Sequence, residues 1–459
     1  MDHWDYPGDR FCHYIENQVS MKSVTIIGAG ESGVGAAILA KKMGLEVFVS
    51  DSGTIAGHYK NELIEFDIPF EEGGHDFEKV LVTEVVVKSP GVPEHAAVLR
   101  MLKEKGRKVI SEIEFGSLFF SGLTIAITGS NGKTTTSGLL YHILKTAGLN
   151  VALGGNYGKS YARILAEETP EIMVLEISSF QLDDIETFRP QISILLNITP
   201  DHLDRYEYKM ENYVNSKFRI TMNQRAEDHF IYNGDDPEIL RKMSGFVSPV
   251  HRIPVTAEKY IHGIPSKDGS GVFELSIKGR HNMFNAACTV EASRLVGLTE
   301  SQIAKGLSTF VNLPHRLESC GTIRGVEYIN DSKATNVDSV YYALDAMTKP
   351  VVWIAGGTDK GNDYSVLVPL VREKVKALIC LTDYSQKLID AFSPVLSDIK
   401  VTKDVSEAVR LGLEMSVAGD VVLLSPACAS FDLFKNYIDR GDKFRKSVAE
   451  LAEKMISVG

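Results

Sequence analysis

A glycine-rich loop at residues 129–134 is the part of the chain whose residue types point most directly to chemistry. It reads Gly-Ser-Asn-Gly-Lys-Thr and follows the apolar residues 123–128, which are typical of a buried strand. Gly132 allows backbone N–H groups to turn toward an anion, and the helix expected after the loop adds a partial positive charge. Lys133 can then reach the β- and γ-phosphates, and Thr134 can place its hydroxyl on Mg²⁺. The loop predicts that the chain binds ATP and cleaves its γ-phosphate.

The first glycine of the common phosphate-loop pattern, G-x-x-x-x-G-K-[S/T], is missing here. Ile127 stands at that position, and the chain has Gly129 instead. An ordinary turn between a strand and a helix could carry Gly-Lys-Thr by chance. Because the strand, the loop and the helix all fall where phosphate binding needs them, we interpret the loop as an ATP site.

A second glycine-rich turn, Gly28-Ala-Gly30-Glu-Ser-Gly33, follows the apolar residues 24–27, and Asp51 ends the next strand. This spacing is typical of a dinucleotide-binding turn, and three interpretations stay open on the residues alone. The turn could hold NAD(P), it could hold the pyrophosphate of a UDP-sugar, or it could only pack a helix against a strand. Because the ATP loop lies in a separate domain, we favour a nucleotide-linked substrate over a redox cofactor.

Strands that alternate with helices must position both loops. The segments that we interpret as strands are 24–27, 47–50, 85–87, 123–128, 173–175, 192–196, 326–329, 351–355, 377–381 and 421–424. This alternation indicates an α/β fold with parallel sheets, in which binding groups gather at the C-terminal ends of the strands. We expect three domains: a Rossmann-like domain at 21–111, a central P-loop ATPase domain at 112–312 and a C-terminal Rossmann-like domain at 313–459. Residues 1–20 are interpreted as an extension outside these domains.

The composition limits the kind of protein this can be. With 459 residues and a formal net charge of −11, the chain is a poor candidate for general nucleic-acid or membrane-surface binding. The five cysteines form no Cys-x-x-Cys pair, which argues against zinc and a disulfide framework and favours a reducing cytoplasm. In the sequence, no apolar run reaches the roughly 18 residues that a membrane span needs. We expect a cytoplasmic monomer.

Several blocks of sequence resemble the Mur ligases, the family that adds amino acids to peptidoglycan precursors. The segment Thr-Gly-Ser-Asn-Gly-Lys-Thr at 128–134 resembles the ATP loop of that family, including its missing first glycine. The other blocks are Leu-Glu-Ile-Ser-Ser-Phe-Gln-Leu at 175–182, Asn-Ile-Thr-Pro-Asp-His-Leu-Asp at 197–204, Gly-Arg-His-Asn-Met-Phe-Asn at 279–285, Leu-Pro-His-Arg at 313–316, Asn-Asp-Ser-Lys-Ala-Thr-Asn at 330–336 and Ser-Pro-Ala-Cys-Ala-Ser-Phe-Asp at 425–432. The last two blocks resemble most specifically the branch that adds D-glutamate. The resemblance covers nearly all of residues 21–459.

The resemblance implies a reaction that joins a carboxylate to an amine. ATP would phosphorylate the carboxylate of UDP-N-acetylmuramoyl-L-alanine, and the amine of D-glutamate would attack the acyl phosphate, as a step of peptidoglycan precursor synthesis. A carboxylate is a poor electrophile until one oxygen becomes a good leaving group, so such a ligase needs cations and N–H donors around the transferring oxygens. The resemblance also implies two Mg²⁺ ions and a carbamate, formed from CO₂ on a lysine.

The catalytic and metal-binding residues are assigned by the same resemblance. The catalytic set is Lys133, Glu176, His202, Lys217 and Lys333, and the metal-binding set is Thr134, Glu176, His202 and the carbamylated Lys217. From the residues alone, Glu176 at the end of a strand is a reasonable hard-oxygen ligand. His202 after Pro-Asp could also be a surface turn residue, and Lys217 could be an ordinary solvated lysine.

Further residues are assigned to the three ligands by resemblance. For ATP they are Gly129, Ser130, Asn131, Gly132, Lys133, Thr134, Thr135, Asn282, Asn285, Arg316 and Asp331. For D-glutamate they are Lys333, Thr335, Lys360, Ser430 and Phe431, and for the UDP substrate they are Glu31, Ser32, Asp51, Ser52, Asn156 and His202. Asn282 and Asn285 lie one helical turn apart, which suits one ligand but also fits a helix cap with a polar face. Gly53 replaces an arginine that the family often has, so one contact to the phosphate or base is in doubt.

Two alternatives of different kinds remain. A sister ligase, either another Mur ligase or folylpolyglutamate synthetase, would differ in the amino acid it accepts; the Asp-Asn-Pro-Arg block of the branch that adds diaminopimelate or lysine is absent from the sequence. An NAD(P)-linked oxidoreductase or a nucleotide-binding regulatory protein would leave Lys133 and Thr134 unexplained, and a dehydrogenase would release no phosphate from ATP. Because both substrates of such a ligase span several domains, we expect the C-terminal domain to close on ATP and substrate and to exclude water from the acyl phosphate.

Overall fold

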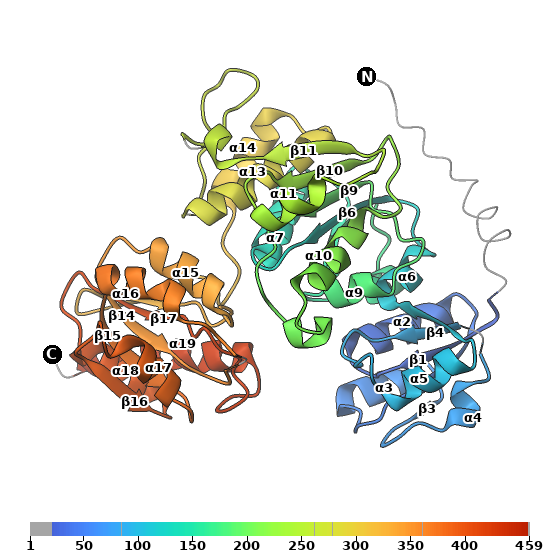
Figure 1. Cartoon of the computed structure of the whole chain (residues 1–459), viewed down its shortest axis with the longest axis horizontal. Coiled ribbons are helices and arrows are strands. Elements are labelled where there is room, and N and C mark those ends of the chain that lie inside the picture. The colour runs from blue at the N-terminus through green and yellow to red at the C-terminus, as the bar shows by residue number, and fades with distance from the viewer. Residues whose placement is uncertain (1–20, 84, 261, 278, 360, 458–459) are drawn as a thin grey trace. The chain divides into compact units, whose positions relative to one another are not determined.

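The computed structural model of the chain contains three sheets, each formed by one continuous part of the sequence. It describes residues 21–457 apart from 84, 261, 278 and 360, so the predictions for 1–20 and for Lys360 lie outside the described residues. The three sheets are coloured blue, green and orange to red in Figure 1, and helices pack along each of them.

The first sheet has five parallel strands in the order β3-β2-β1-β4-β5. Its elements are β1 (Ser23–Ile27), α2 (Glu31–Lys42), β2 (Glu46–Ser50), α3 (Gly57–Glu65), β3 (Phe70–Glu71), α4 (Phe77–Val80), β4 (Val85–Lys88), α5 (Ala97–Glu104) and β5 (Lys108–Ser111). Val24, Ile26 and Val87 are fully buried, because a parallel sheet covered on both faces needs apolar side chains on both. The strand order reverses between β1 and β4, so the loops after these two strands diverge and leave room for a ligand.

The second sheet has six parallel strands in the order β11-β10-β9-β6-β8-β7. Its strands are β6 (Leu123–Thr128), β7 (Val151–Gly155), β8 (Ile172–Glu176), β9 (Ile192–Leu195), β10 (His229–Asn233) and β11 (His251–Val255). The helices of this part are α6 (Glu112–Ser117), α7 (Lys133–Thr146), α8 (Tyr161–Glu167), α9 (Ser179–Asp183), α10 (Met210–Phe218), α11 (Pro237–Met243), α12 (Ala257–Tyr260), α13 (Arg280–Leu295) and α14 (Glu300–Thr309), with short 3₁₀ turns η1 (Leu203–Tyr206) and η2 (Arg219–Thr221). Because β6 lies between β8 and β9, the loops after those two strands flank the glycine-rich loop.

The third sheet has six strands in the order β12-β13-β17-β14-β15-β16. Its elements are β12 (Glu318–Ile323), β13 (Val326–Asn330), α15 (Val337–Asp345), β14 (Val351–Ala355), η3 (Ser365–Leu367), α16 (Val368–Lys374), β15 (Val375–Leu381), α17 (Gln386–Phe392), β16 (Ile399–Thr402), α18 (Val405–Glu414), β17 (Val421–Leu424) and α19 (Tyr437–Ser457). The strands from β13 onward pair in parallel, whereas β12 pairs with β13 antiparallel through a tight turn at Arg324 and Gly325, which have φ of 49° and 79°. The loops after β13, β17 and β14 are therefore neighbours.

The described residues divide into two compact units. One holds the first two sheets together with residues 286–307, and the other holds the third sheet together with residues 273–285. The predicted α/β class with three sheet-containing parts is confirmed, while the exact domain boundaries stay a prediction. Within the described part of the chain, no helix is both long and apolar enough to cross a membrane. Cys288, Cys320, Cys380 and Cys428 are free thiols.

Candidate active site

The loop between β6 and α7 has the backbone of an anion-binding turn. Gly132 takes a left-handed conformation with φ of 87°, and α7 begins at the next residue, Lys133. Gly129 has φ of 154°, and a Cβ atom there would lie 3.0 Å from the Cβ of Leu196. Both positions therefore require glycine. The N-terminus of α7, with its partial positive charge, faces the loop as the sequence predicts.

The segment after β9 holds this loop in place. Asn197 accepts the N–H of Ser130 on its carbonyl at 2.9 Å and the N–H of Asn131 on its Oδ1 at 2.8 Å. The Ser130 hydroxyl accepts the N–H of Thr199 at 3.0 Å and lies 3.1 Å from the hydroxyl of Tyr213. Ser130 was predicted to bind ATP, and its side chain contributes here by fixing the shape of the loop.

Two lysine side chains converge on the carbonyls of the loop. Lys133 Nζ donates to the carbonyls of Gly129 at 2.7 Å and Ser130 at 2.8 Å, and Lys217 Nζ donates to the same Gly129 carbonyl at 2.8 Å. Lys217 is 1% exposed on α10, so the alternative of a solvated lysine is wrong. Burial, reinforced by the charge of Lys133, lowers the pKa of Lys217 well below its ordinary value. The side chain of Lys217 is thus a buried lysine held against the glycine-rich loop, with a pKa below the ordinary value.

Glu176 lies beside the start of the loop because β8 pairs with β6. Its neighbour Ile177 donates its N–H to the carbonyl of Ile127 at 2.8 Å. Glu176 is 2% exposed, and its Oε1 accepts the side-chain N–H of Asn156 at 2.9 Å. The structure therefore brings together Glu176 and Asn156, which the sequence assigned to different ligands.

His202 lies in a turn just before η1, with a left-handed φ of 52°. Its ring packs edge-on against Phe180 with 5.1 Å between centroids, and its Nε2 lies 3.5 Å from Oδ2 of Asp201. The side chain is 38% exposed. This placement agrees with a turn residue and also leaves the imidazole accessible to a ligand, so the metal-binding assignment of His202 stays a prediction.

The groups around the loop suit a hard cation. Thr134 is the second residue of α7 and is 2% exposed, and the carboxylate of Glu176 ends the adjacent strand. Within the part of the chain that the structure describes, no three His, Cys, Asp or Glu side chains gather as a metal site. A Mg²⁺ site here would need oxygens from the Thr134 hydroxyl and from a modified Lys217 in addition to Glu176.

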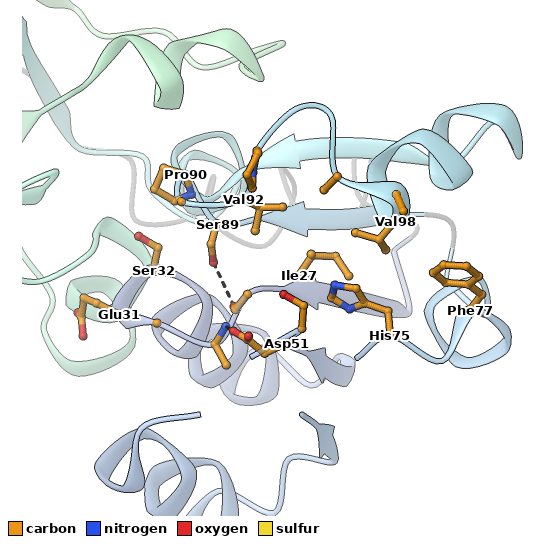
Figure 2. Close-up of a pocket in the computed structure, with 18 residues that line it drawn as sticks. Ile27, Glu31, Ser32, Asp51, His75, Phe77, Ser89, Pro90, Val92 and Val98 are labelled. Carbon is orange, nitrogen blue, oxygen red and sulfur yellow. Dashed lines mark hydrogen bonds between the residues drawn. The ribbon is translucent and has the colours of Figure 1, made fainter. Parts of the chain in front are cut away.

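A pocket of about 640 Å³ lies at the reversal of strand order between β1 and β4. It is lined by the predicted residues Glu31, Ser32, Asp51 and Ser52, whereas Asn156 and His202 are not among its lining residues. Figure 2 shows Glu31 and Ser32 at one end of the pocket and Phe77 toward the other. The glycine-rich turn after β1 therefore opens into a real cavity, which argues against a turn that serves packing alone.

Asp51 stabilises the backbone of this pocket. Its Oδ2 accepts the N–H of Ala29 at 2.6 Å, and its Oδ1 accepts the N–H of Gly53 at 2.7 Å. The carboxylate thereby joins the loop after β1 to the loop after β2. Sequence spacing alone predicted a ligand contact for Asp51, and the structure adds this positioning role.

Two ion-pair groups connect the first and second sheets within their shared unit. Glu31 Oε1 accepts the N–H of Ser160 at 3.0 Å and pairs with Arg163 Nε at 2.8 Å. Lys88, at the end of β4 and 4% exposed, pairs with Asp184 Oδ2 at 2.6 Å. The charged side chain of Glu31 thus points to α8, and its contribution to UDP binding stays a prediction.

The loops after β13 and β17 place a buried carboxyl group at the edge of the third sheet. Asp331 is 6% exposed; its Oδ2 accepts the hydroxyl of Ser425 at 2.9 Å and its Oδ1 accepts the N–H of Leu317 at 3.2 Å. Burial raises the pKa of Asp331 to about 7, against the opposing effects of the Ser425 bond and the charge of Arg316. Asp331 and Arg316, both predicted for ATP, therefore lie near each other.

The residues predicted for D-glutamate lie in the same group of loops. The ammonium of Lys333 lies 5.5 Å from the ring centre of Tyr437, and the Lys333 carbonyl accepts the N–H of Thr335 at 3.0 Å. Ser430 is buried and Phe431 is 70% exposed in the loop after the adjacent strand β17. This arrangement brings a cation and a hydroxyl onto neighbouring loops.

Arg440 on α19 is a residue that the sequence analysis missed. It is 1% exposed, and its guanidinium donates to the hydroxyl and carbonyl of Ser332 and to the carbonyls of Gly356 and Cys428, at 2.9 to 3.3 Å. One side chain thus holds the loops after β13, β14 and β17 together. No local motif marks it, because its partners lie as far as 108 positions away in the sequence.

Asn282 and Asn285 lie on one face of α13, as predicted from their spacing. They are 4% and 3% exposed, and Asn285 Nδ2 donates to Asn282 Oδ1 at 3.5 Å. Burial, together with the charge of Arg316, lowers the pKa of the neighbouring His281 to about 4. The ring is neutral at pH 7, and the adenine assignment of the two amides stays a prediction.

Comparison with known proteins agrees with this architecture in each of its three parts. The MurD N-terminal domain model matches residues 23–98, the Mur ligase middle domain model matches 127–293, and the Mur ligase, glutamate ligase domain model matches 315–428. These three models define the chain as a Mur ligase, with the phosphate loop in its middle domain.

Similar proteins whose names state their reaction narrow the class of Mur ligase further. The UDP-N-acetylmuramoylalanine–D-glutamate ligase of Christiangramia forsetii is 47% identical over 443 residues, which cover 94% of this chain and 100% of that protein. The UDP-N-acetylmuramate-alanine ligase of Thermotoga maritima shares the fold, with a TM-score of 0.61 at 18% identity over 94% of this chain and 99% of the other. The MurF ligase from the same organism, solved in complex with ADP, has a TM-score of 0.60 at 15% identity over 89% and 95%. The chain belongs to the UDP-N-acetylmuramoylalanine–D-glutamate ligase family of the Mur ligases.

Proposed function

We propose that the chain uses ATP to join D-glutamate to UDP-N-acetylmuramoyl-L-alanine through an acyl phosphate, as a cytoplasmic step of peptidoglycan precursor synthesis. The observation that carries the proposal is the phosphate loop, where Lys133 and Lys217 converge on the carbonyl of Gly129. The end-to-end similarity to a relative named for this reaction supports the choice of substrates. The pocket beside β1 then receives the UDP part, and a redox cofactor is not needed.

The loop residues would bind and polarise the phosphates of ATP. The N–H groups at the start of α7 face the loop. The Lys133 ammonium, which donates to loop carbonyls in this structure, would turn to the β- and γ-phosphates of bound ATP. Arg316 and Lys333 would supply further cations for the phosphoryl group and the substrate carboxylate. Charge that develops on the transferring oxygens is stabilised by such fixed donors, which is the main source of rate enhancement in phosphoryl transfer.

The D-glutamate site would be built from the loops at the edge of the third sheet. Lys333, Thr335, Lys360, Ser430 and Phe431 are the residues we assign to it. Two carboxylates need at least two donors, and the Lys333 ammonium with the Ser430 hydroxyl can supply them from neighbouring loops. Arg440 would fix the geometry of those loops without touching the substrate.

Thr134, Glu176, His202 and a carbamylated Lys217 would hold Mg²⁺; the hydroxyl, carboxylate and carbamate supply the hard oxygens that this ion prefers, and His202 adds a ring nitrogen. When bound, the ions would neutralise charge on the phosphate oxygens. The carbamate would form when the neutral amine of Lys217 adds to the carbon of CO₂ and releases one proton. Burial and the nearby charge of Lys133 lower the pKa of Lys217, which favours the neutral amine, while Asp183 and Asp201 oppose this effect.

A phosphate-release assay tests the proposed function. ATP, Mg²⁺, UDP-N-acetylmuramoyl-L-alanine and D-glutamate together should give inorganic phosphate and the amide, and omission of any one should abolish the amide. L-alanine, L-glutamate and diaminopimelate in place of D-glutamate separate this activity from that of the sister ligases. Amide formation with one of those amino acids, and none with D-glutamate, would contradict the proposal.

The carbamate is tested by Lys217→Ala. We expect the rate to fall by about 10² to 10³, because an oxygen ligand of the Mg²⁺ that neutralises the transferring phosphate is lost, and short-chain carboxylic acids should restore part of it. Lys209→Ala is the matched control, since Lys209 lies on the surface, where it pairs with Glu207. An unimpaired Lys217→Ala enzyme would show that the lysine has no role in the reaction.

A further inference from the structure

The pocket beside β1 and β4 has two chemically different ends. At one end the glycine-rich turn and the start of α2 present backbone N–H groups, which suit phosphate. Toward the other end lie the ring of His75 and the apolar side chains of Phe77 and Val98 (Figure 2). Phe77 is 44% exposed although it is apolar. A diphosphate joined to a flat base has the same two-part character as this pocket.

Ser50 connects His75 to a carboxylate and thereby sets the tautomer of the imidazole. Ser50 Oγ lies 2.6 Å from Glu71 Oε1 and 2.6 Å from His75 Nδ1. Glu71 Oε1 also accepts the N–H of Asp76 at 2.8 Å, so this oxygen is an acceptor and receives the single hydroxyl proton of Ser50. The Ser50 oxygen then accepts the proton on Nδ1. The neutral ring therefore carries its proton on Nδ1 and a lone pair on Nε2.

Nε2 is the ring nitrogen that is not engaged by Ser50. Among the residues that the structure describes, His75 hydrogen-bonds through Nδ1, while its ring lines the pocket. Burial lowers the pKa of His75, and the carboxylates of Glu71 and Asp51 offset this only in part, so the imidazole is neutral at pH 7. The ammonium of Lys79 lies 3.8 Å from Glu71 and reduces the effect of that carboxylate.

The other carboxylate of the pocket already has backbone partners. Both oxygens of Asp51 accept backbone N–H groups, from Ala29 and Gly53. The position after Ser52 is Gly53, so this chain presents no side-chain donor there. His75 thus offers a directed acceptor at the end of the pocket that suits a base.

We propose that His75 Nε2 accepts the N3–H of the uracil ring and thereby selects uridine-linked over cytidine-linked substrates. The inference rests on the proposed function, which places the UDP part in this pocket. Uracil carries one N–H between two carbonyls, whereas cytosine has an unprotonated nitrogen at that position. The lone pair on Nε2 attracts the N3–H of uracil and repels the unprotonated nitrogen of cytosine. His75 is then a specificity-determining residue for the nucleotide half of the substrate.

Two substitutions separate base recognition from a structural role. His75→Asn keeps a side-chain N–H close to the position of Nδ1 for the bond to Ser50 but removes the acceptor at Nε2. His75→Gln places an amide oxygen near the position of Nε2. His58→Asn, on the exposed face of α3, is the matched control. Calorimetric titration of the full-length chain with UDP, CDP and N3-methyl-UDP measures the preference, and thermal melting checks folding.

We expect the wild type and His58→Asn to prefer UDP over both analogues by about tenfold, as the loss of one buried hydrogen bond implies. His75→Asn should bind all three alike, and His75→Gln should keep most of the preference. The ratio of UDP affinity to N3-methyl-UDP affinity should also fall in the wild type as the pH drops through the pKa of His75, whereas in His75→Asn the ratio should not change, because the terminal phosphate titrates alike in both ligands. A folded His75→Asn protein with the wild-type preference overturns the inference alone, while a wild type that binds no UDP overturns the proposed function as well.

Discussion

At the scale of single residues, Glu112 is a buried carboxyl group outside the phosphate loop. It is 1% exposed at the start of α6, and its Oε1 accepts the N–H of Ala162 at 2.5 Å. Its Oε2 is buried and has no hydrogen-bond partner among the described residues. Burial raises the pKa of Glu112 to about 7, with the Ala162 bond opposing and the charge of Glu31 adding to the shift. Folding therefore favours the protonated form of the Glu112 side chain.

Glu112→Gln should make the chain more stable relative to the wild type as the pH rises. The folded pKa lies above the unfolded value of 4.5, so the stability contributed by the protonated form is complete below that value and is lost as the pH rises to about 7. The loss at pH 8 is on the order of 3 kcal/mol, and a neutral amide does not suffer it. Melting temperatures at pH 5 and pH 8 measure the effect, with the exposed Glu104→Gln as control. Parallel pH dependence of wild type and Glu112→Gln would contradict this account.

Arg440→Lys should lower kcat/KM for D-glutamate by about 10² with little change in the UDP substrate's KM. A lysine ammonium cannot reach three loops in the planar fork geometry that the guanidinium uses, so the loops that carry Lys333 and Ser430 lose their common support. Arg445→Lys on the same helix is the control, because Arg445 makes surface ion pairs with Glu318 and Asp442. Steady-state kinetics that are equal for the two variants would show that Arg440 does not position the site.

At the scale of elements, the contact between α2 and α8 should control how firmly the pocket beside β1, proposed to bind UDP, is held. Glu31→Gln removes the ion pair with Arg163, while Arg163 keeps Glu62 as a partner at 2.6 Å. We expect KM for the UDP substrate to rise a few-fold with kcat nearly unchanged, because Glu31 lies within the glycine-rich turn, where α2 begins. Glu65→Gln, on the exposed end of α3, should change neither constant. A fall in kcat alone would argue for a different role.

The strands that the sequence predicted are mostly the central ones, and the physical reason is their burial. β14 and β17 are apolar along their length, and β6 is interrupted only by threonines, because both faces of these strands are covered. Strands nearer the edges escaped the pattern: β3 has two residues, and β11 contains Pro254 and two exposed residues before it. The β12–β13 hairpin also escaped, because an Arg-Gly turn is a weaker signal than Asn-Gly.

The residues of the candidate site also differ in whether the sequence could predict them. Lys133 was predicted from the glycine-rich loop and Glu176 was a reasonable metal ligand at a strand end, because a parallel sheet gathers its loops at one edge, whereas Asp331 was assigned by resemblance alone. Arg440 and His75 could not be predicted, since each acts through contacts that only the folded chain creates. The burial of Lys217 could not be predicted either, because the neighbouring sequence alone indicates a solvated lysine on a helix.

At the scale of the whole molecule, the two compact units should unfold as two calorimetric transitions. The first unit contains two sheets joined by the ion pairs of Lys88 and Arg163, so we expect these sheets to melt together. The third sheet has its own core around Trp353 and should give the second transition. Differential scanning calorimetry of the full chain measures this. A third transition that a stabilising UDP ligand removes would contradict this expectation. It would show that the first sheet unfolds independently of the second.

The ion pairs between the first two sheets also bear on how such a chain can be recombined. Lys88 and Glu31 belong to the first sheet's part, while Asp184 and Arg163 belong to the second. A hybrid that exchanged the nucleotide-binding segment for one from a distant homologue would bury Asp184 or Arg163 without its partner unless the matching residue came with it. Inheritance of the nucleotide-binding segment is thus coupled to that of the ATPase segment. Successful chimaeras should be those whose parents agree at these four positions and at Glu62, the second partner of Arg163.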